Sequence, residues 1–128
     1  MSCFWDSLIQ SISLDDKINY FNNNNLNPTQ FVTILKNNNI LTNNVLWNNE
    51  ILKTQTLKEN LEAIDTYDIN TIYNGYYCST CEPFLFLLCE FLNIEIQHNY
   101  NNNLMIYKNT KKNRYIIKIQ SNNDHCWK

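Results

Sequence analysis

The fold of this chain is decided by a segment near its start, Cys3-Phe4-Trp5-Asp6-Ser7-Leu8-Ile9-Gln10-Ser11-Ile12. Its apolar residues recur at the spacing of an α-helix, and its polar residues fall on the opposite face. Neither Gly nor Pro interrupts the pattern. The segment therefore predicts an amphipathic helix whose first residue is a cysteine.

Cys3 stands at the N-terminus of this predicted helix, where unpaired backbone N–H groups and the positive end of the dipole stabilise a thiolate. A thiol nucleophile also needs a histidine base within hydrogen-bond reach, and His125 near the other end of the chain is the candidate. His98 is the second candidate, or a residue of a turn. The alternative interpretation is that Cys3 is a small apolar residue and His125 a capping residue.

Length and composition indicate one globular domain over residues 1–128, with 44% hydrophobic and 13% aromatic residues. The formal net charge of -2 and the lack of a basic face argue against nucleic-acid binding. The one cationic cluster, Lys108 to Arg114, is interpreted as a solvated turn between two strands. The sequence does not indicate an oligomeric state.

Asparagine is unusually abundant, with 25 residues against a single glycine, Gly75. Much of it is clustered, at Asn22–Asn25, Asn37–Asn39 and Asn101–Asn103. Because Asn tolerates left-handed backbone and favours turns, we expect these clusters to form the chain reversals for which other proteins use glycine.

Five irregularly spaced cysteines do not form the framework of a secreted, disulfide-bonded domain. No signal peptide opens the sequence, and its longest apolar run, Phe84 to Cys89, is too short to span a bilayer. We expect an intracellular protein without a membrane partner.

Periodicity and capping signals predict helices in the first two thirds of the chain and short strands in the last third. Turns of asparagine or lysine join the strands, which favours antiparallel pairing. Helices first and a small C-terminal antiparallel sheet make an α+β fold. The first three expected helices are residues 3–12, a helix capped by Ser13 that ends at Phe21, and residues 28–37 after an Asn27 cap. Two more helices are expected, one from Thr54 or Thr56 to about Tyr67 with a Thr56–Glu59 capping box, and one over residues 81–92 capped by Thr80 or Ser79. The expected strands are residues 45–47, 94–98, 104–107 and 115–119.

Two further patterns admit a functional interpretation beside a structural one. Cys78-Ser79-Thr80-Cys81 has the spacing of half a zinc site or a redox pair, but no second such pair follows. We favour thiols that close a loop onto a buried helix, and therefore expect no metal and no cofactor; a small zinc-binding domain is the weaker possibility. Trp47 and the tyrosines of residues 68–77 line a binding groove or form the rim of the core.

The order of these features resembles the ovarian-tumour (OTU) family of cysteine proteases, especially the short OTU-like proteins of large DNA viruses. The nucleophile segment of that family is similar to Cys3-Phe4-Trp5-Asp6-Ser7-Leu8. Its central segment, a Gly-containing loop, an apolar helix and an alternating strand, resembles residues 73–96. Its closing strand followed by a histidine is partly matched at His125.

This resemblance implies a papain-like, OTU-type fold with Cys3 as nucleophile and His125 as general base. Backbone N–H groups at and before Cys3 would form the oxyanion hole. Asp124 or Asn123 would orient the imidazole, although neither matches the position of the third triad residue in the family. Phe4 and Trp5 would pack behind the nucleophile. The substrate would be the isopeptide bond after the C-terminal glycine of ubiquitin or a ubiquitin-like protein, in the host cytoplasm if the protein is viral.

The sequence also departs from the family pattern, which keeps a second class of function open. Only two residues precede Cys3, and Trp127 stands where the third triad residue often lies. The alternative is therefore a catalytically silent OTU-like module that binds ubiquitin or another host protein.

Overall fold

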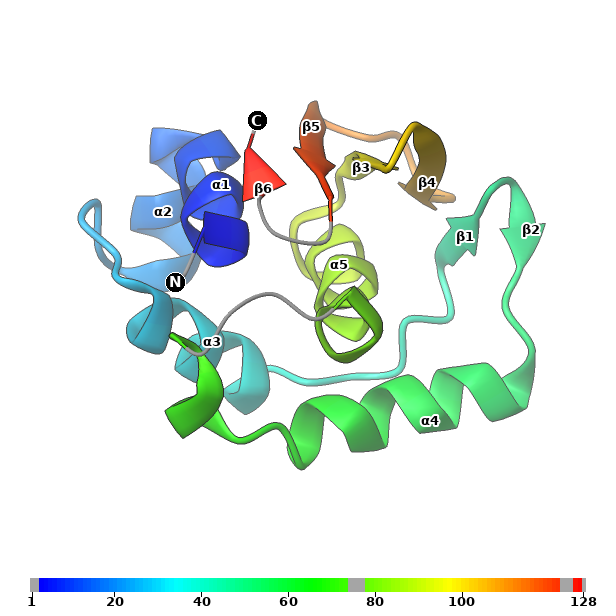
Figure 1. The fold of residues 1–128 in the computed structure, drawn as a ribbon, viewed down its shortest axis with the longest axis horizontal. Helices are drawn as coiled ribbons and strands as arrows, with labels where there is room; N and C mark the ends of the chain where they lie inside the picture. The colour runs from blue at the N-terminus through cyan, green and yellow to red at the C-terminus, as the bar shows by residue number, and fades with distance from the viewer. Residues whose placement is uncertain (1–2, 74–77, 123–125, 128) are drawn as a thin grey trace.

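The computed structural model describes residues 3–73, 78–122 and 126–127, with the backbone alone for 78–80 and 126–127. The described part is a mixed α+β structure, which confirms the predicted class at that level (Figure 1). Its elements in chain order are α1 (Cys3–Ser11), α2 (Leu14–Phe21), α3 (Pro28–Asn37), β1 (Val45–Trp47), β2 (Glu50–Ile51), α4 (Thr54–Asp65), the 3-10 helix η1 (Ile69–Thr71), α5 (Cys78–Leu92), β3 (Glu95–Tyr100), β4 (Asn103–Asn109), β5 (Ile116–Ser121) and β6 (Cys126–Trp127).

Two helices begin at the caps that the sequence predicts. The Ser13 side chain accepts a hydrogen bond from the Asp16 backbone N–H at the start of α2. Asn27 and Gln30 form a reciprocal capping box at the start of α3, with Pro28 as its first residue. These side chains satisfy N–H groups that a helix cannot pair internally.

The start of α4 at Thr54 is one of its two predicted starts, but its predicted capping box and the predicted start of α5 are wrong. Helix α4 begins at Thr54 after Lys53, which makes no side-chain cap, so the expected Thr56–Glu59 box does not form. Helix α5 begins at Cys78 rather than Cys81, and Pro83 lies inside it. The small polar residues of the Cys-Ser-Thr-Cys segment give no apolar period, so the sequence pattern starts this helix too late.

The six strands form one sheet in the order β2-β1-β4-β3-β5-β6. Strands β3 and β4 pair antiparallel as predicted, but β5 pairs parallel to β3, so the wholly antiparallel C-terminal sheet is wrong. Residues 110–115 cross the start of β3 instead of forming a hairpin, and Tyr115 O accepts a hydrogen bond from the Glu95 N–H at this crossing. The N-terminal strands β1 and β2 extend the same sheet.

One face of the sheet carries the core. Helix α1 contacts β5 and β6, α5 contacts β1, β3 and β4, and α3 and α4 pack against α5 (Figure 1). The most apolar helix, α5, is buried over Phe84 to Cys89, as its composition predicts. Alternate residues of β5 are buried and exposed, so its other face is open to solvent.

Asparagine does replace glycine at chain reversals. Each described non-glycine residue with positive φ is an asparagine: Asn22, Asn48, Asn49, Asn93, Asn101 and Asn102. Two such residues in succession join β1 to β2 and β3 to β4, which is the backbone of a type I′ hairpin turn. The prediction is confirmed at Asn22 and at Asn101–Asn102, but wrong for Asn37–Asn39, where the Asn38 cap has a φ of -110°.

Candidate functional site

Cys3 is the first residue of α1 and is partly exposed. Its backbone carbonyl accepts a hydrogen bond of 2.7 Å from the Ser7 hydroxyl, which holds the first turn of the helix closed. The first N–H groups of a helix have no acceptor within it and favour negative charge nearby. The structure therefore places Cys3 at the start of a helix, as the sequence predicts.

The two aromatic residues after Cys3 anchor the helix in the core. Phe4 and Trp5 are each only 2% exposed, and their rings meet edge to face with centroids 5.0 Å apart. The Trp5 ring also packs edge to face on Phe84 of α5 at 5.1 Å and on Tyr67 at 6.0 Å. This burial agrees with the expectation that both residues pack behind Cys3, and it fixes the position of the first turn of α1.

The C-terminal strands reach the same region. Helix α1 contacts β5 and β6, and these strands pair antiparallel with Ser121 opposite Cys126 (Figure 1). The predicted base His125 and its partner Asp124 belong to the sequence between these strands, and both lie outside the described residues. The fold thus brings the helix that begins at Cys3 beside the strand that follows His125 in the sequence.

His98, the second candidate for the base, is completely buried within β3, so the prediction that it is a turn residue is wrong. Its Nε2 lies 2.6 Å from the Ser121 hydroxyl oxygen, and its ring centroid is 6.4 Å from that of Phe4. Burial lowers the pKa of His98 to about 4, because the charged imidazolium would lose its hydration. A side chain that holds a proton this weakly is a poor general base near neutral pH, which argues against His98 as the base.

The buried cysteines have a different environment from Cys3. Cys81 and Cys89 are at most 4% exposed, and the Cys89 thiol donates to the Tyr107 carbonyl oxygen. Burial raises the pKa of Cys89 well above its usual value, which keeps this thiol protonated and unreactive. Cys78 and Cys81 lie together in the first turn of α5, and the described residues hold no group of three or more His, Cys, Asp or Glu side chains arranged for a metal ion.

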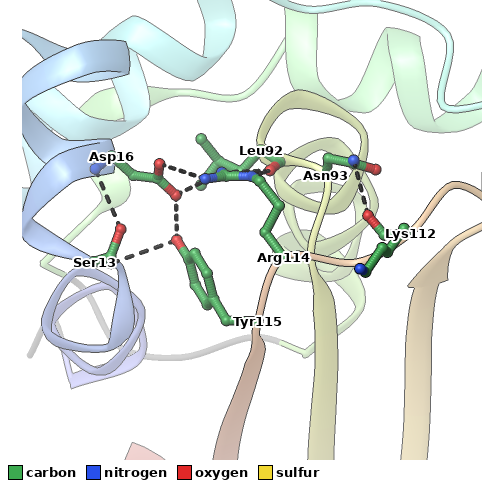
Figure 2. Close-up of polar contacts among 7 residues, drawn as sticks. All are labelled: Ser13, Asp16, Leu92, Asn93, Lys112, Arg114 and Tyr115. Carbon is green, nitrogen blue, oxygen red and sulfur yellow. Dashed lines mark hydrogen bonds and ion pairs between the residues drawn. The ribbon is translucent and has the colours of Figure 1, made fainter.

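The prediction of a solvated turn from Lys108 to Arg114 is wrong at Arg114, which belongs to a polar cluster that no local sequence pattern indicates. Arg114 forms a bidentate ion pair with the buried carboxylate of Asp16, at 2.8 and 3.0 Å, and donates to the Leu92 carbonyl oxygen at the end of α5 (Figure 2). The Tyr115 hydroxyl donates to the same carboxylate. Burial, and then this hydrogen bond, raise the pKa of Tyr115 to about 12. The cluster fastens α2 to the end of α5 and the start of β5, and residues so far apart give no local sequence signal.

The proposed aromatic groove is only partly present in the described residues. Trp47 lines a cavity, together with residues of β2, α4 and α5. Tyr73 is 53% exposed and is not part of that lining, while Tyr76 and Tyr77 lie outside the described residues.

Comparisons with protein-family models, with curated proteins and with solved structures found no match to this chain. None of the helices in the described ranges has the length and apolar character needed to cross a membrane.

Proposed function

We propose that this protein is a thiol-dependent hydrolase of the OTU type, which cleaves conjugates of ubiquitin or a ubiquitin-like protein in the cytoplasm of a host cell. Cys3 is the nucleophile, His125 the general base and Asp124 the residue that orients the imidazole. One observation carries the proposal: α1, which begins at Cys3, contacts the two strands that flank Asp124 and His125 in the sequence. The likeness of the Cys3–Leu8 segment to the nucleophile segment of the family supports it.

The reaction follows from these roles. His125 takes the proton of the Cys3 thiol, and the thiolate attacks the carbonyl carbon of the isopeptide bond. The negative oxygen of the tetrahedral intermediate is stabilised by backbone N–H groups at the start of α1. The leaving lysine amine takes the proton from the imidazolium, and water then cleaves the thioester to regenerate the thiol.

The rigid first turn of α1 also supports this role. Catalytic geometry tolerates little displacement, and Phe4 and Trp5 hold this turn in the aromatic core. Burial lowers the pKa of the neighbouring His98 to about 4, so this side chain binds a proton too weakly to compete as a second base.

The test is covalent labelling with ubiquitin that carries an electrophile at its C-terminus, read by intact mass. We expect one adduct on the wild-type protein and none on Cys3→Ser or His125→Asn. Cys78→Ser is the matched control, because Cys78 is likewise the first residue of a helix. We expect the Cys78→Ser variant to be labelled as the wild type is.

An adduct that survives in Cys3→Ser would refute the assignment of the nucleophile. The absence of any adduct on the folded, reduced wild type would refute the hydrolase. Ubiquitin binding by that unreactive protein would then favour the alternative, a catalytically silent OTU-like binding module.

A further inference from the structure

A cavity of about 330 Å³ lies at the end of the sheet away from α1. Its walls come from β1, from β2 and the residues after it, from the first turn of α4 and from α5. This volume is at the small end of the usual range for ligand sites, and it suits one side chain better than a large cofactor.

The cavity is lined by two carboxylates that lack a basic partner. Glu50 and Glu82 form no ion pair in the described part of the chain, where the single salt bridge joins Asp16 to Arg114. Lys53 also lines the cavity, but it is exposed and pairs with neither carboxylate. The acidic groups therefore outnumber the basic one, and the site favours a cation.

The Glu82 carboxylate is held in place by a neighbouring strand. Its Oε2 accepts a hydrogen bond of 2.7 Å from the Tyr107 hydroxyl of β4, while Oε1 has no donor among the described residues. A carboxylate that is fixed through one oxygen and open at the other is ready to accept from a charged donor. The Glu50 carboxylate makes no hydrogen bond with any described residue, so it is available as well.

Aromatic walls complete the site. Trp47 and Phe86 line the cavity on the β1 and α5 sides. The indole Nε1 of Trp47 is buried without a hydrogen-bond partner among the described residues, which costs free energy that a peptide carbonyl oxygen can recover, although a guanidinium group, which has no acceptor, cannot. Indole faces attract cations, and the planar guanidinium group stacks on them better than an ammonium does.

We propose that this cavity binds the guanidinium group of an arginine side chain, carried by a peptide segment of a partner protein. Among the described residues no group of three or more His, Cys, Asp or Glu side chains is arranged for a metal ion, whereas two carboxylates pair well with the donors of one guanidinium. The site lies at the opposite end of the sheet from Cys3 and does not depend on the proposed hydrolase.

The neighbouring strand edge indicates a peptide rather than a small cation. Strand β2 ends the sheet, so its outer backbone edge has no strand partner among the described residues. Ile51 on this strand is 84% exposed, and both Glu50 and Ile51 line the cavity. An extended segment can add to such an edge through its main chain while one side chain enters an adjacent pocket.

The test compares two blocked five-residue, strand-forming peptides by calorimetry, one with a central arginine and one with citrulline, its uncharged isostere. We expect at least tenfold tighter binding of the arginine peptide. This preference should fall about tenfold in Glu82→Gln and less in the more exposed Glu50→Gln. Glu62→Gln is the matched control, because Glu62 is an exposed carboxylate of α4 that does not line the cavity.

Equal binding of the two peptides, or no binding of either, would overturn the proposal. A preference that persists in the Glu50→Gln, Glu82→Gln double variant would also overturn it. If arginine amide alone binds as tightly as the peptide, the edge of β2 takes no part and the peptide assignment is wrong. Should Glu82→Gln fail to fold, Glu50→Gln and Trp47→Leu provide the same comparison.

Discussion

The two ends of the sheet differ in how much of their surface is covered. At the β6 end, α1 lies on the strands and buries the rings of Phe4 and Trp5. At the β2 end, the strand is two residues long and is followed by an open cavity. A well-packed end can hold a reactive group in a fixed geometry, whereas an uncovered strand edge can admit a partner.

Trp5→Ala tests the packed end most severely. The ring contacts Phe4, Phe31, Tyr67 and Phe84, so its removal should cost about 3–5 kcal/mol of unfolding free energy. Trp47→Ala at the other end should cost only about 1–2 kcal/mol, because that side chain is partly exposed. Urea unfolding of both variants measures the difference. Equal losses would contradict the contrast between the two ends.

Asp16→Asn tests whether the packed end depends on its ion pair. Asp16 is buried and Arg114 is 41% exposed in its side chain, so we expect a loss of about 2 kcal/mol, below the cost of breaking a fully buried pair. Asp15→Asn, at the exposed neighbouring position, should cost less than about 1 kcal/mol. A comparable effect of both variants in urea unfolding would mean that the helix dipole, and not the pair, accounts for the loss.

His98 should make the packed end sensitive to acid. Its pKa is about 4 in the folded protein and about 6.5 when unfolded, so below pH 6.5 the unfolded state binds the proton more readily. This contribution to stability is complete above pH 6.5 and is lost as the pH falls toward 4. Between pH 7.5 and pH 5 the loss is about 2 kcal/mol.

Urea unfolding at these two pH values, with His98→Gln as the reference, isolates the contribution of His98. The reference should lack about 2 kcal/mol of the wild-type pH dependence, while that of the carboxylates remains. Identical pH dependence in the two proteins would mean that His98 titrates normally in the folded state.

Ile51→Thr should have the smallest effect. The side chain is 84% exposed and Thr keeps a high β propensity, so the change in unfolding free energy should stay within about 0.5 kcal/mol. Ile117→Thr, at a buried position of β5, should cost about 2 kcal/mol or more. Thermal unfolding of the pair gives the comparison, and a large effect at Ile51 would mean that the β2 edge is covered in solution.

Local signals predicted the local structure of this chain well. The caps Ser13 and Asn27, the apolar helix over Phe84 to Cys89 and the short strand over residues 45–47 all follow from neighbouring residues. The parallel pairing of β5 with β3 does not, because nothing in residues 110–115 distinguishes a crossover from a hairpin.

The candidate site could be predicted only in part, for the same reason. Helical spacing places Cys3 at the start of α1, but its approach to the C-terminal strands depends on the whole sheet. The Asp16–Arg114 pair joins residues 98 positions apart, and the residues next to Arg114 in the sequence indicate only a charged side chain on the surface. The prediction of a turn at His98 is wrong, because the burial that places this residue inside β3 and lowers its pKa comes from elements distant in the sequence.

The asparagine turns also have a consequence for how the chain tolerates mutation. Asn48 adopts a positive φ between β1 and β2, and its side-chain oxygen also accepts the N–H of Ile106 in β4. Asn93 likewise reverses the chain after α5 and donates to the Lys112 carbonyl oxygen (Figure 2). Glycine at either position would keep the backbone turn but lose the side-chain hydrogen bond. Aspartate would keep the acceptor at position 48 but lose the donor at position 93. At these two positions asparagine therefore supplies both the positive-φ backbone and a side-chain hydrogen bond. Substitution by glycine would weaken the contacts between neighbouring segments before it changed the fold.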